Sequence, residues 1–193
     1  MRIQLLIALL GTTTSVMAQN ALFRSHEAYV AKQGDAVDGL IDVEPQLGRF
    51  TVVFEKEGRK RHISTRKVWG FMNNGALYRM EQESKLPVRL MAQGAIFYWE
   101  NGFAHLRMQQ DSTAAASIEY GYAAYLSRDL QGPIVPAVFA VDDTKSASAK
   151  FKAAWPAYKD LLESIGAGDG MDRVRQLVVE YEVAVEEGKI AGP

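Results

Sequence analysis

The sequence predicts an α+β protein, in which an antiparallel β-meander (an open sheet or a partial barrel) precedes a C-terminal pair of helices. Three observations support this fold class. Residues 49–55 alternate between two sets of side chains, which is the period of a strand with one buried face. The dipeptide Asn-Gly occurs at residues 74–75 and 101–102 and favours the tight turn of a hairpin. After residue 145, apolar residues recur every three or four positions, as in an amphipathic helix.

The first 18 residues have the pattern of a secretory signal peptide. Arg2 supplies the positive charge, residues 3–10 form an apolar run, and cleavage is expected between Ala18 and Gln19. The alternative is a buried N-terminal helix. The apolar run is too short for a stable membrane anchor. We therefore expect an exported protein, located in a periplasm or outside the cell.

The Asn74-Gly75 turn accounts for the aromatic stretch around it without a ligand. A two-residue loop at this position places Phe71 opposite Tyr78 and Trp69 opposite Met80. The four large side chains then share one face, where cross-strand pairs contribute about 0.2–1 kcal/mol each. We interpret this stretch as a hairpin, not as a binding or catalytic site.

Further strands follow along the chain. The turn at residues 101–102 predicts a second hairpin, in which Trp99 lies opposite Ala104. Residues 117–127 are another strand candidate. Two prolines limit residues 131–138 to a loop or an edge strand.

The C-terminal part of the chain is expected to form two helices. The first either kinks or begins at Pro156, because proline fits only the first turn of a regular helix. The second carries apolar residues from Met171 to Val185 on one face, and Asp169 is expected to cap its N-terminus. The chain thus divides into a signal peptide, a β-rich domain, a helical segment and a frayed tail: residues 1–18, 19–141, 142–187 and 188–193.

Several stretches carry a resemblance to a known family. They are "FTVVFEKEGRKRHISTRKVWGF", "ALYRM", "VRLMAQGAIFYW", a tyrosine-rich strand, "FKAAWPAYKDLLESI" and "MDRVRQLVVEYE". Together they resemble a family of uncharacterised secreted proteins common in Bacteroidetes-type bacteria, over residues 37–182. One departure is Glu182 after Tyr181, where the family usually has Asn. The resemblance implies export and this order of elements, and it implies no established activity.

No catalytic or metal-binding signature occurs in the sequence. There is no cysteine, so neither a disulfide nor a thiolate nucleophile can form. The three histidines, His26, His62 and His105, lack the spacing of a metal motif, and no serine lies in a Gly-x-Ser-x-Gly turn. We therefore predict no catalytic residue, no metal and no cofactor.

Two groups of residues are candidates for an interaction surface. Arg59, Lys60 and Arg61 form the densest basic stretch, which would suit an anionic glycan or lipid. The alternative is a solvated hairpin whose charges protect a sheet edge from pairing. Tyr120 and Tyr122 fall on one face of their strand, where their rings would serve either as a ligand platform or as part of the core.

These observations predict a non-catalytic binding or interaction module of the bacterial cell envelope. An envelope protein or an anionic glycan or lipid would be its partner. The near balance of 22 basic and 23 acidic residues gives no argument for nucleic acid, and no membrane span is expected after signal cleavage. The alternative is a carboxylate-dependent hydrolase acting on envelope glycan or peptide. That activity would need a cleft with at least two convergent carboxylates.

Overall fold

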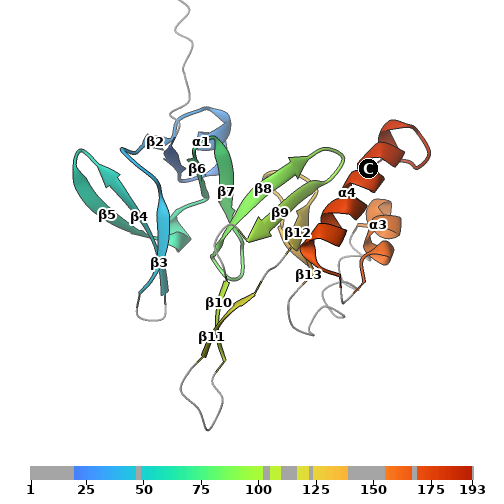
Figure 1. Ribbon diagram of the computed structural model, residues 1–193. Coiled ribbons are helices and arrows are strands. Elements are labelled where there is room, and N and C mark those ends of the chain that lie inside the picture. Colours follow the sequence, from blue (N-terminus) through green and yellow to red (C-terminus); the bar gives the residue numbers. More distant parts are fainter. Residues whose placement is uncertain are drawn as a thin grey trace, which may run out of the picture.

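The computed structural model describes residues 20–46, 49–101, 105–109, 117–121, 124–138, 155–166 and 169–192. Within them the chain forms an eight-stranded antiparallel sheet, a three-stranded sheet and a two-stranded ribbon, followed by C-terminal helices (Figure 1). The predicted α+β class is confirmed, and the large sheet is open. The predicted signal peptide and the predicted boundary between residues 141 and 142 lie outside the described residues.

The strands follow one another mostly as hairpins. The large sheet has the order β13-β12-β9-β8-β7-β6-β1-β2, and the three-stranded sheet has the order β3-β4-β5. The bounds are β1 (Ala21–Phe23), β2 (Asp35–Ala36), β3 (Asp42–Gln46), β4 (Arg49–Lys56), β5 (Arg59–Ser64), β6 (Gly70–Asn73), β7 (Ala76–Met80), β8 (Pro87–Gln93), β9 (Phe97–Asn101), β10 (His105–Gln109), β11 (Ser117–Gly121), β12 (Ala124–Ser127) and β13 (Val135–Val138).

The predicted turn at Asn74-Gly75 forms as expected. Asn74 and Gly75 have φ angles of 48° and 79°, the left-handed values that a type I′ turn requires. Phe71 pairs with Tyr78, and their rings stack with centroids 4.9 Å apart. The turn at Glu57-Gly58 likewise has positive φ at both residues and connects β4 to β5.

Trp69 does not share the face of Phe71, Tyr78 and Met80, so that part of the hairpin prediction is wrong. Strand β6 begins only at Gly70, and the two-residue alternation does not extend back to Trp69. Its ring packs instead on the opposite face, 5.4 Å from the ring of Tyr29.

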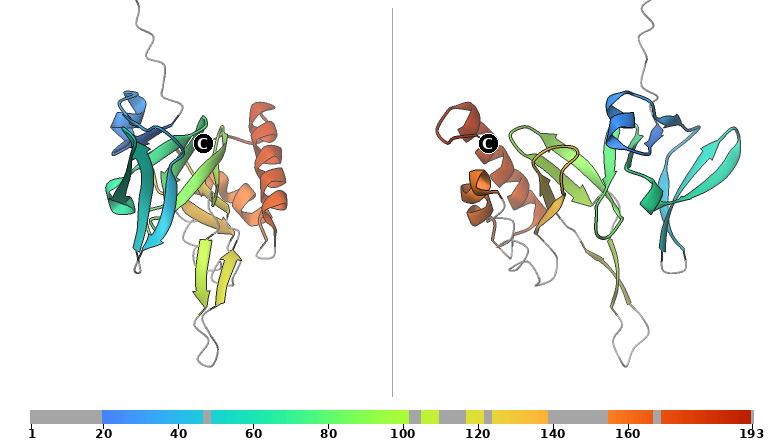
Figure 2. Two further views of the ribbon diagram at one scale, coloured as in Figure 1. Left: turned by 60° about the vertical axis from the view of Figure 1, so that its left-hand side comes forward. Right: turned by 180° about the vertical axis from the view of Figure 1, so that it is seen from behind.

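The predicted second hairpin is also wrong, because β9 does not pair with β10. Strand β9 lies between β8 and β12, and Trp99 is opposite Leu90 and Tyr125. With both edges of β9 occupied, β10 pairs with β11 instead and forms a ribbon that projects from the rest of the chain (Figures 1 and 2). The stretch 117–127 is therefore two strands. The expected edge strand near Pro136 is confirmed as β13.

Both faces of the large sheet are partly covered. On one face of the large sheet, strands β1, β6 and β7 pack against the three-stranded sheet around Leu22, Phe71 and Val52. On the same face, β9 and β12 pack against the C-terminal helices around Tyr98 and Leu177. The opposite face buries a third cluster centred on Trp99 and Val88, which includes residues from α1 and from the segment before β13. Figures 1 and 2 show the three-stranded sheet and the C-terminal helices at opposite ends of the large sheet.

The described helices are α1 (His26–Val30), α3 (Lys159–Ser164) and α4 (Met171–Glu186), with 3₁₀ turns η1 (Thr65–Lys67) and η2 (Pro156–Tyr158). Pro156 occupies the first turn of η2, which leads into α3, so the described helix begins there. Asp169 does not cap α4: the N-cap is Gly170, and the Asp169 carboxylate accepts a hydrogen bond from the Gly166 N–H instead. None of the described helices has the length and apolarity to span a bilayer.

Candidate functional site

One row of neighbouring residues crosses the covered face of the large sheet from one end to the other. Antiparallel partners share a face, so the pairing places these side chains together: Leu22, Phe71, Tyr78, Arg89, Glu100 and Ala124. The first two lie in the core under the three-stranded sheet, and the last lies under the helices. The part of the sheet face at the middle of the row therefore lies between the part that the three-stranded sheet covers and the part that the helices cover.

A cleft of about 500 Å³ opens at this middle position. Its walls come from the segment that leads into β3, from the β6–β7 hairpin and from β8. This volume lies within the range of about 300–1,000 Å³ that small-ligand sites occupy. The cleft is lined by Leu40, Ile41, Asp42, Asn73, Asn74, Ala76, Tyr78 and Arg89.

Hydrogen bonds hold the walls of the cleft together. The Asn73 side chain accepts from the Ile41 N–H at 2.9 Å and donates to the Ile41 carbonyl at 2.7 Å. The Asn74 N–H donates to the side chain of Asn20 at 2.7 Å. These bonds join segments that are distant in the sequence, so the shape of the cleft is set by the fold before any ligand arrives.

Two opposite charges face the cleft without pairing to each other. Arg89 is exposed, and no hydrogen bond or ion pair with a described residue engages its guanidinium group. Asp42 is exposed as well, and its Oδ1 accepts a hydrogen bond from the Val43 N–H at 2.7 Å. The ring of Tyr78, stacked on Phe71, lies between the buried core and this polar rim.

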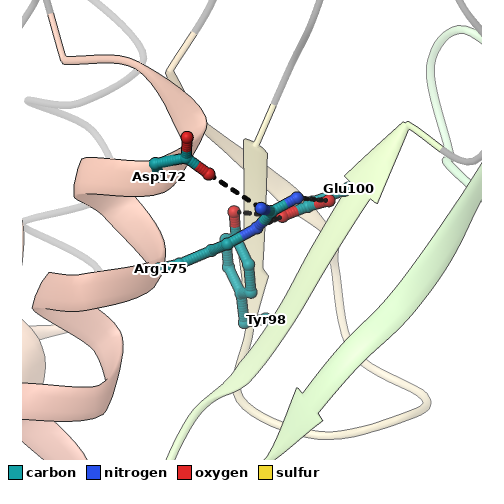
Figure 3. Close-up of polar contacts among 4 residues, drawn as sticks. All are labelled: Tyr98, Glu100, Asp172 and Arg175. Carbon is teal, nitrogen blue, oxygen red and sulfur yellow. Dashed lines mark hydrogen bonds and ion pairs between the residues drawn. The ribbon is translucent and has the colours of Figure 1, made fainter.

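An ion-pair network lies one strand further along the same row, where Glu100 is the partner of Arg89. Figure 3 shows its four residues, Tyr98, Glu100, Asp172 and Arg175. Glu100 is only 6% exposed and forms a bidentate pair with the guanidinium of Arg175 on α4, with Nη2 at 2.7 Å from Oε2. Tyr98 donates its hydroxyl to Glu100 at 2.8 Å, and Asp172 accepts from Arg175 at 2.8 Å. The network therefore fixes α4 to β9.

The pKa values of this network follow from burial and pairing. Burial opposes the ionisation of Glu100, but the hydrogen bonds from Arg175 and Tyr98 and the charges of Arg175 and Arg89 outweigh it, so the pKa of Glu100 is lowered. Burial, with the bond to Glu100, raises the pKa of Tyr98. The bonds to Glu100 raise the pKa of Arg175. Both oxygens of Glu100 thus already accept hydrogen bonds, and Glu100 is a poor candidate for a catalytic acid or base.

A second carboxylate of α4 binds the loop between β8 and β9. Glu182 accepts hydrogen bonds from the N–H groups of Ala95 and Ile96, at 2.8 and 2.9 Å. Tyr158 donates its hydroxyl to the Ala95 carbonyl at 2.8 Å. Arg175 and Glu182 are seven residues apart, and thus lie on one side of the helix. Together they attach α4 at two points to the large sheet.

The predicted basic surface lies on β5, which forms one edge of the three-stranded sheet. Arg59, Lys60 and Arg61 are all exposed, but successive residues of a strand point to opposite faces. Arg59 and Arg61 share one face, whereas Lys60 lies on the other and pairs with Glu44 at 3.2 Å. The three charges therefore do not form one patch, and their role as an interaction surface stays a prediction.

The predicted tyrosine platform stays a prediction as well. Tyr120 lies on β11 opposite Leu106, but its side chain is outside the described residues, as is the whole of Tyr122.

The histidines and acidic residues that are described do not converge on a metal site. Among the described residues, no group of three or more His, Asp or Glu side chains is arranged so that it could hold a metal ion. His26 stands at the start of α1 beside Trp69, with ring centroids 5.4 Å apart, and His62 is exposed on β5. Only the backbone of His105 is described.

Arg79 is a buried cation that sequence reasoning missed. It is 3% exposed, donates to the Gln131 carbonyl at 2.9 Å, and lies 5.7 Å from the ring centre of Trp69. Its Nε and Nη1 have no partner among the described residues, and burial lowers its pKa to about 10. Arg79 faces away from the cleft, because it alternates with Tyr78 along β7, and it fixes the segment before β13.

Comparisons with protein-family models, with curated proteins and with solved structures found no match. The resemblance to secreted Bacteroidetes-type proteins therefore stays a prediction, and the cleft has to be interpreted from its own residues.

Proposed function

We propose that the protein is an exported, non-catalytic binding module of the bacterial cell envelope, and that the cleft lined by the segment before β3, the β6–β7 hairpin and β8 holds its ligand. One observation carries this proposal: Arg89 and Asp42 face a braced cleft of about 500 Å³ without being paired to each other. Concave sites with a few convergent polar groups are where proteins hold small ligands. Export is supported by the leader sequence alone.

The alternative, a carboxylate-dependent hydrolase, is less well supported at this cleft. Among the described residues that line it, Asp42 is the one carboxylate. Glu100 lies beyond Arg89 in the same row, but its oxygens are occupied by Arg175 and Tyr98. Glycosidase chemistry needs two carboxylates across the scissile bond, and a second one would have to come from outside the described lining.

An amide NMR map tests the binding function. Residues 19–193, labelled with ¹⁵N, would be titrated with the low-molecular-weight fraction of a cell-envelope extract from the source organism. We expect resonances of Leu40, Ala76 and Arg89 to shift, because they line the cleft, and those of α1 to stay unchanged. Arg89→Gln should abolish the shifts, whereas the matched change of an exposed arginine outside the cleft, Arg66→Gln, should preserve them.

Two results would contradict the proposal. Shifts confined to residues 59–61 would make β5 the contact surface and leave the cleft without a role. An unchanged map with every envelope fraction would show that the cleft does not bind a small envelope component.

A further inference from the structure

We infer that the ligand of the cleft is a zwitterion, namely a short peptide or amino acid that carries both a free carboxylate and a free ammonium group. This inference rests on the proposed function and specifies its ligand class. It follows from the two opposite charges that line one cleft: Arg89 on β8 and Asp42 at the start of β3.

Arg89 is suited to bind the carboxylate. A guanidinium group presents parallel N–H donors that match the two oxygens of a carboxylate. The nearest acidic neighbour along the row, Glu100, does not form an ion pair with Arg89, since its own oxygens already accept from Arg175 and Tyr98. Arg89 thus lines the cleft, and no described carboxylate has paired with its donors.

Asp42 is suited to bind the ammonium group. Its Oδ1 accepts from the Val43 N–H, so Oδ2 remains as an acceptor for one of the three ammonium donors. A purely anionic ligand at Arg89 would be repelled by Asp42, and a purely cationic ligand at Asp42 would be repelled by Arg89. Charge complementarity within a single site therefore favours a ligand that carries both signs.

The remaining lining suits the body of a short peptide. Leu40 is 60% exposed, and together with Ala76 and Tyr78 it offers apolar contact to a side chain. Asn74 adds an amide, which can both donate to and accept from a peptide group. The site thus offers apolar contact to the body of a short peptide and one charged group to each of its two ends.

Calorimetric titration with trialanine tests the inference on residues 19–193. The probes are the free peptide, its N-acetyl form, its C-terminal amide and the doubly blocked form. We expect each single block to weaken binding at least tenfold, because it removes a hydrogen bond between charged groups. Arg89→Gln should remove the preference for a free carboxylate, and Asp42→Asn the preference for a free amine.

Matched variants keep the test specific. Arg66→Gln and Glu83→Gln change exposed charges outside the cleft and should leave all affinities within about twofold, as surface charges contribute little. Equal affinity for free and blocked peptides would overturn the zwitterion inference while leaving the binding function intact. Failure of all four peptides to bind would overturn the inference too. The NMR titration with envelope extract would then decide separately whether the cleft has a binding function.

Discussion

Replacing Arg175 with methionine is expected to lower the free energy of unfolding by about 3 kcal/mol. Methionine retains the apolar stem but removes the guanidinium, and this leaves the nearly buried carboxylate of Glu100 without its bidentate partner. Breaking a buried ion pair in this way costs about 3–5 kcal/mol. The lower end applies because Arg175 is itself partly exposed and Arg89 still contributes its charge. Urea unfolding followed by circular dichroism measures the change.

Two variants separate the network from a general effect on α4. Arg173→Met removes an exposed arginine of the same helix, which pairs with Glu180 at 3.8 Å, and should cost less than about 1 kcal/mol. Adding Glu100→Gln to Arg175→Met should recover at least half of the lost stability, because the buried side chain that lost its partner is then uncharged. If Arg173→Met destabilised the protein as much as Arg175→Met, the network would not be what fixes α4.

The pH dependence of this effect has a defined sign. The pKa of Glu100 is lowered in the folded protein, so its pairing contributes stability above the unfolded pKa of about 4.3, and that contribution is lost as the pH falls through the folded pKa. Without Arg175, burial should raise the pKa of Glu100 instead. The stability difference between the wild type and Arg175→Met should therefore shrink from about pH 7 to about pH 4. A constant difference would contradict this account.

Replacing Glu182 with alanine is expected to cost about 2 kcal/mol and to loosen the loop between β8 and β9. The side chain accepts two hydrogen bonds, from the Ala95 and Ile96 N–H groups, and bonds to a charged group contribute about 1.5–3 kcal/mol each. The expected loss is smaller than the sum of two such bonds, because Glu182 is partly exposed and water can reach the site. Amide hydrogen exchange at Ala95 and Ile96 should accelerate together with the loss of stability.

Glu180→Ala is the matched control for Glu182→Ala. Glu180 lies on the same helix but is exposed, with bonds only to Gln176 and Arg173. Its replacement should leave exchange at Ala95 and Ile96 unchanged. Unaltered exchange in Glu182→Ala, or equal acceleration in both variants, would show that the carboxylate does not hold this loop.

Local patterns predicted much of the fold, because they depend on neighbours in the sequence. The alternation over residues 49–55 specified strand β4, the Asn74-Gly75 turn specified the β6–β7 hairpin, and the spacing of apolar residues specified α4. The pairing of β9 could not be predicted in this way. The Asn101-Gly102 dipeptide favours a hairpin, but pairing of β9 with β8 and β12 buries Trp99 completely, and this tertiary burial outweighs the turn preference.

The cleft could not be predicted from the sequence, because no short stretch contains it. Asp42, Tyr78 and Arg89 meet there only because the fold brings the start of β3 beside β7 and β8. Local motifs instead favoured Arg59, Lys60 and Arg61, which adjoin in sequence but are divided between two faces of β5. One available signal was Arg89 itself, which is a charged residue within a strand of mostly apolar residues.

A photo-cross-linking residue placed at Leu40 in the living source organism tests whether the cleft holds the ligand. Leu40 lies on the rim of the cleft and is 60% exposed, and Val30 on α1, at 63%, provides a matched position elsewhere on the surface. We expect a discrete adduct at Leu40, identified by intact mass, which Arg89→Gln removes and which Val30 never forms. Equal yields at Leu40 and Val30, or an adduct at Leu40 that persists in Arg89→Gln, would contradict the claim that this cleft is the binding site.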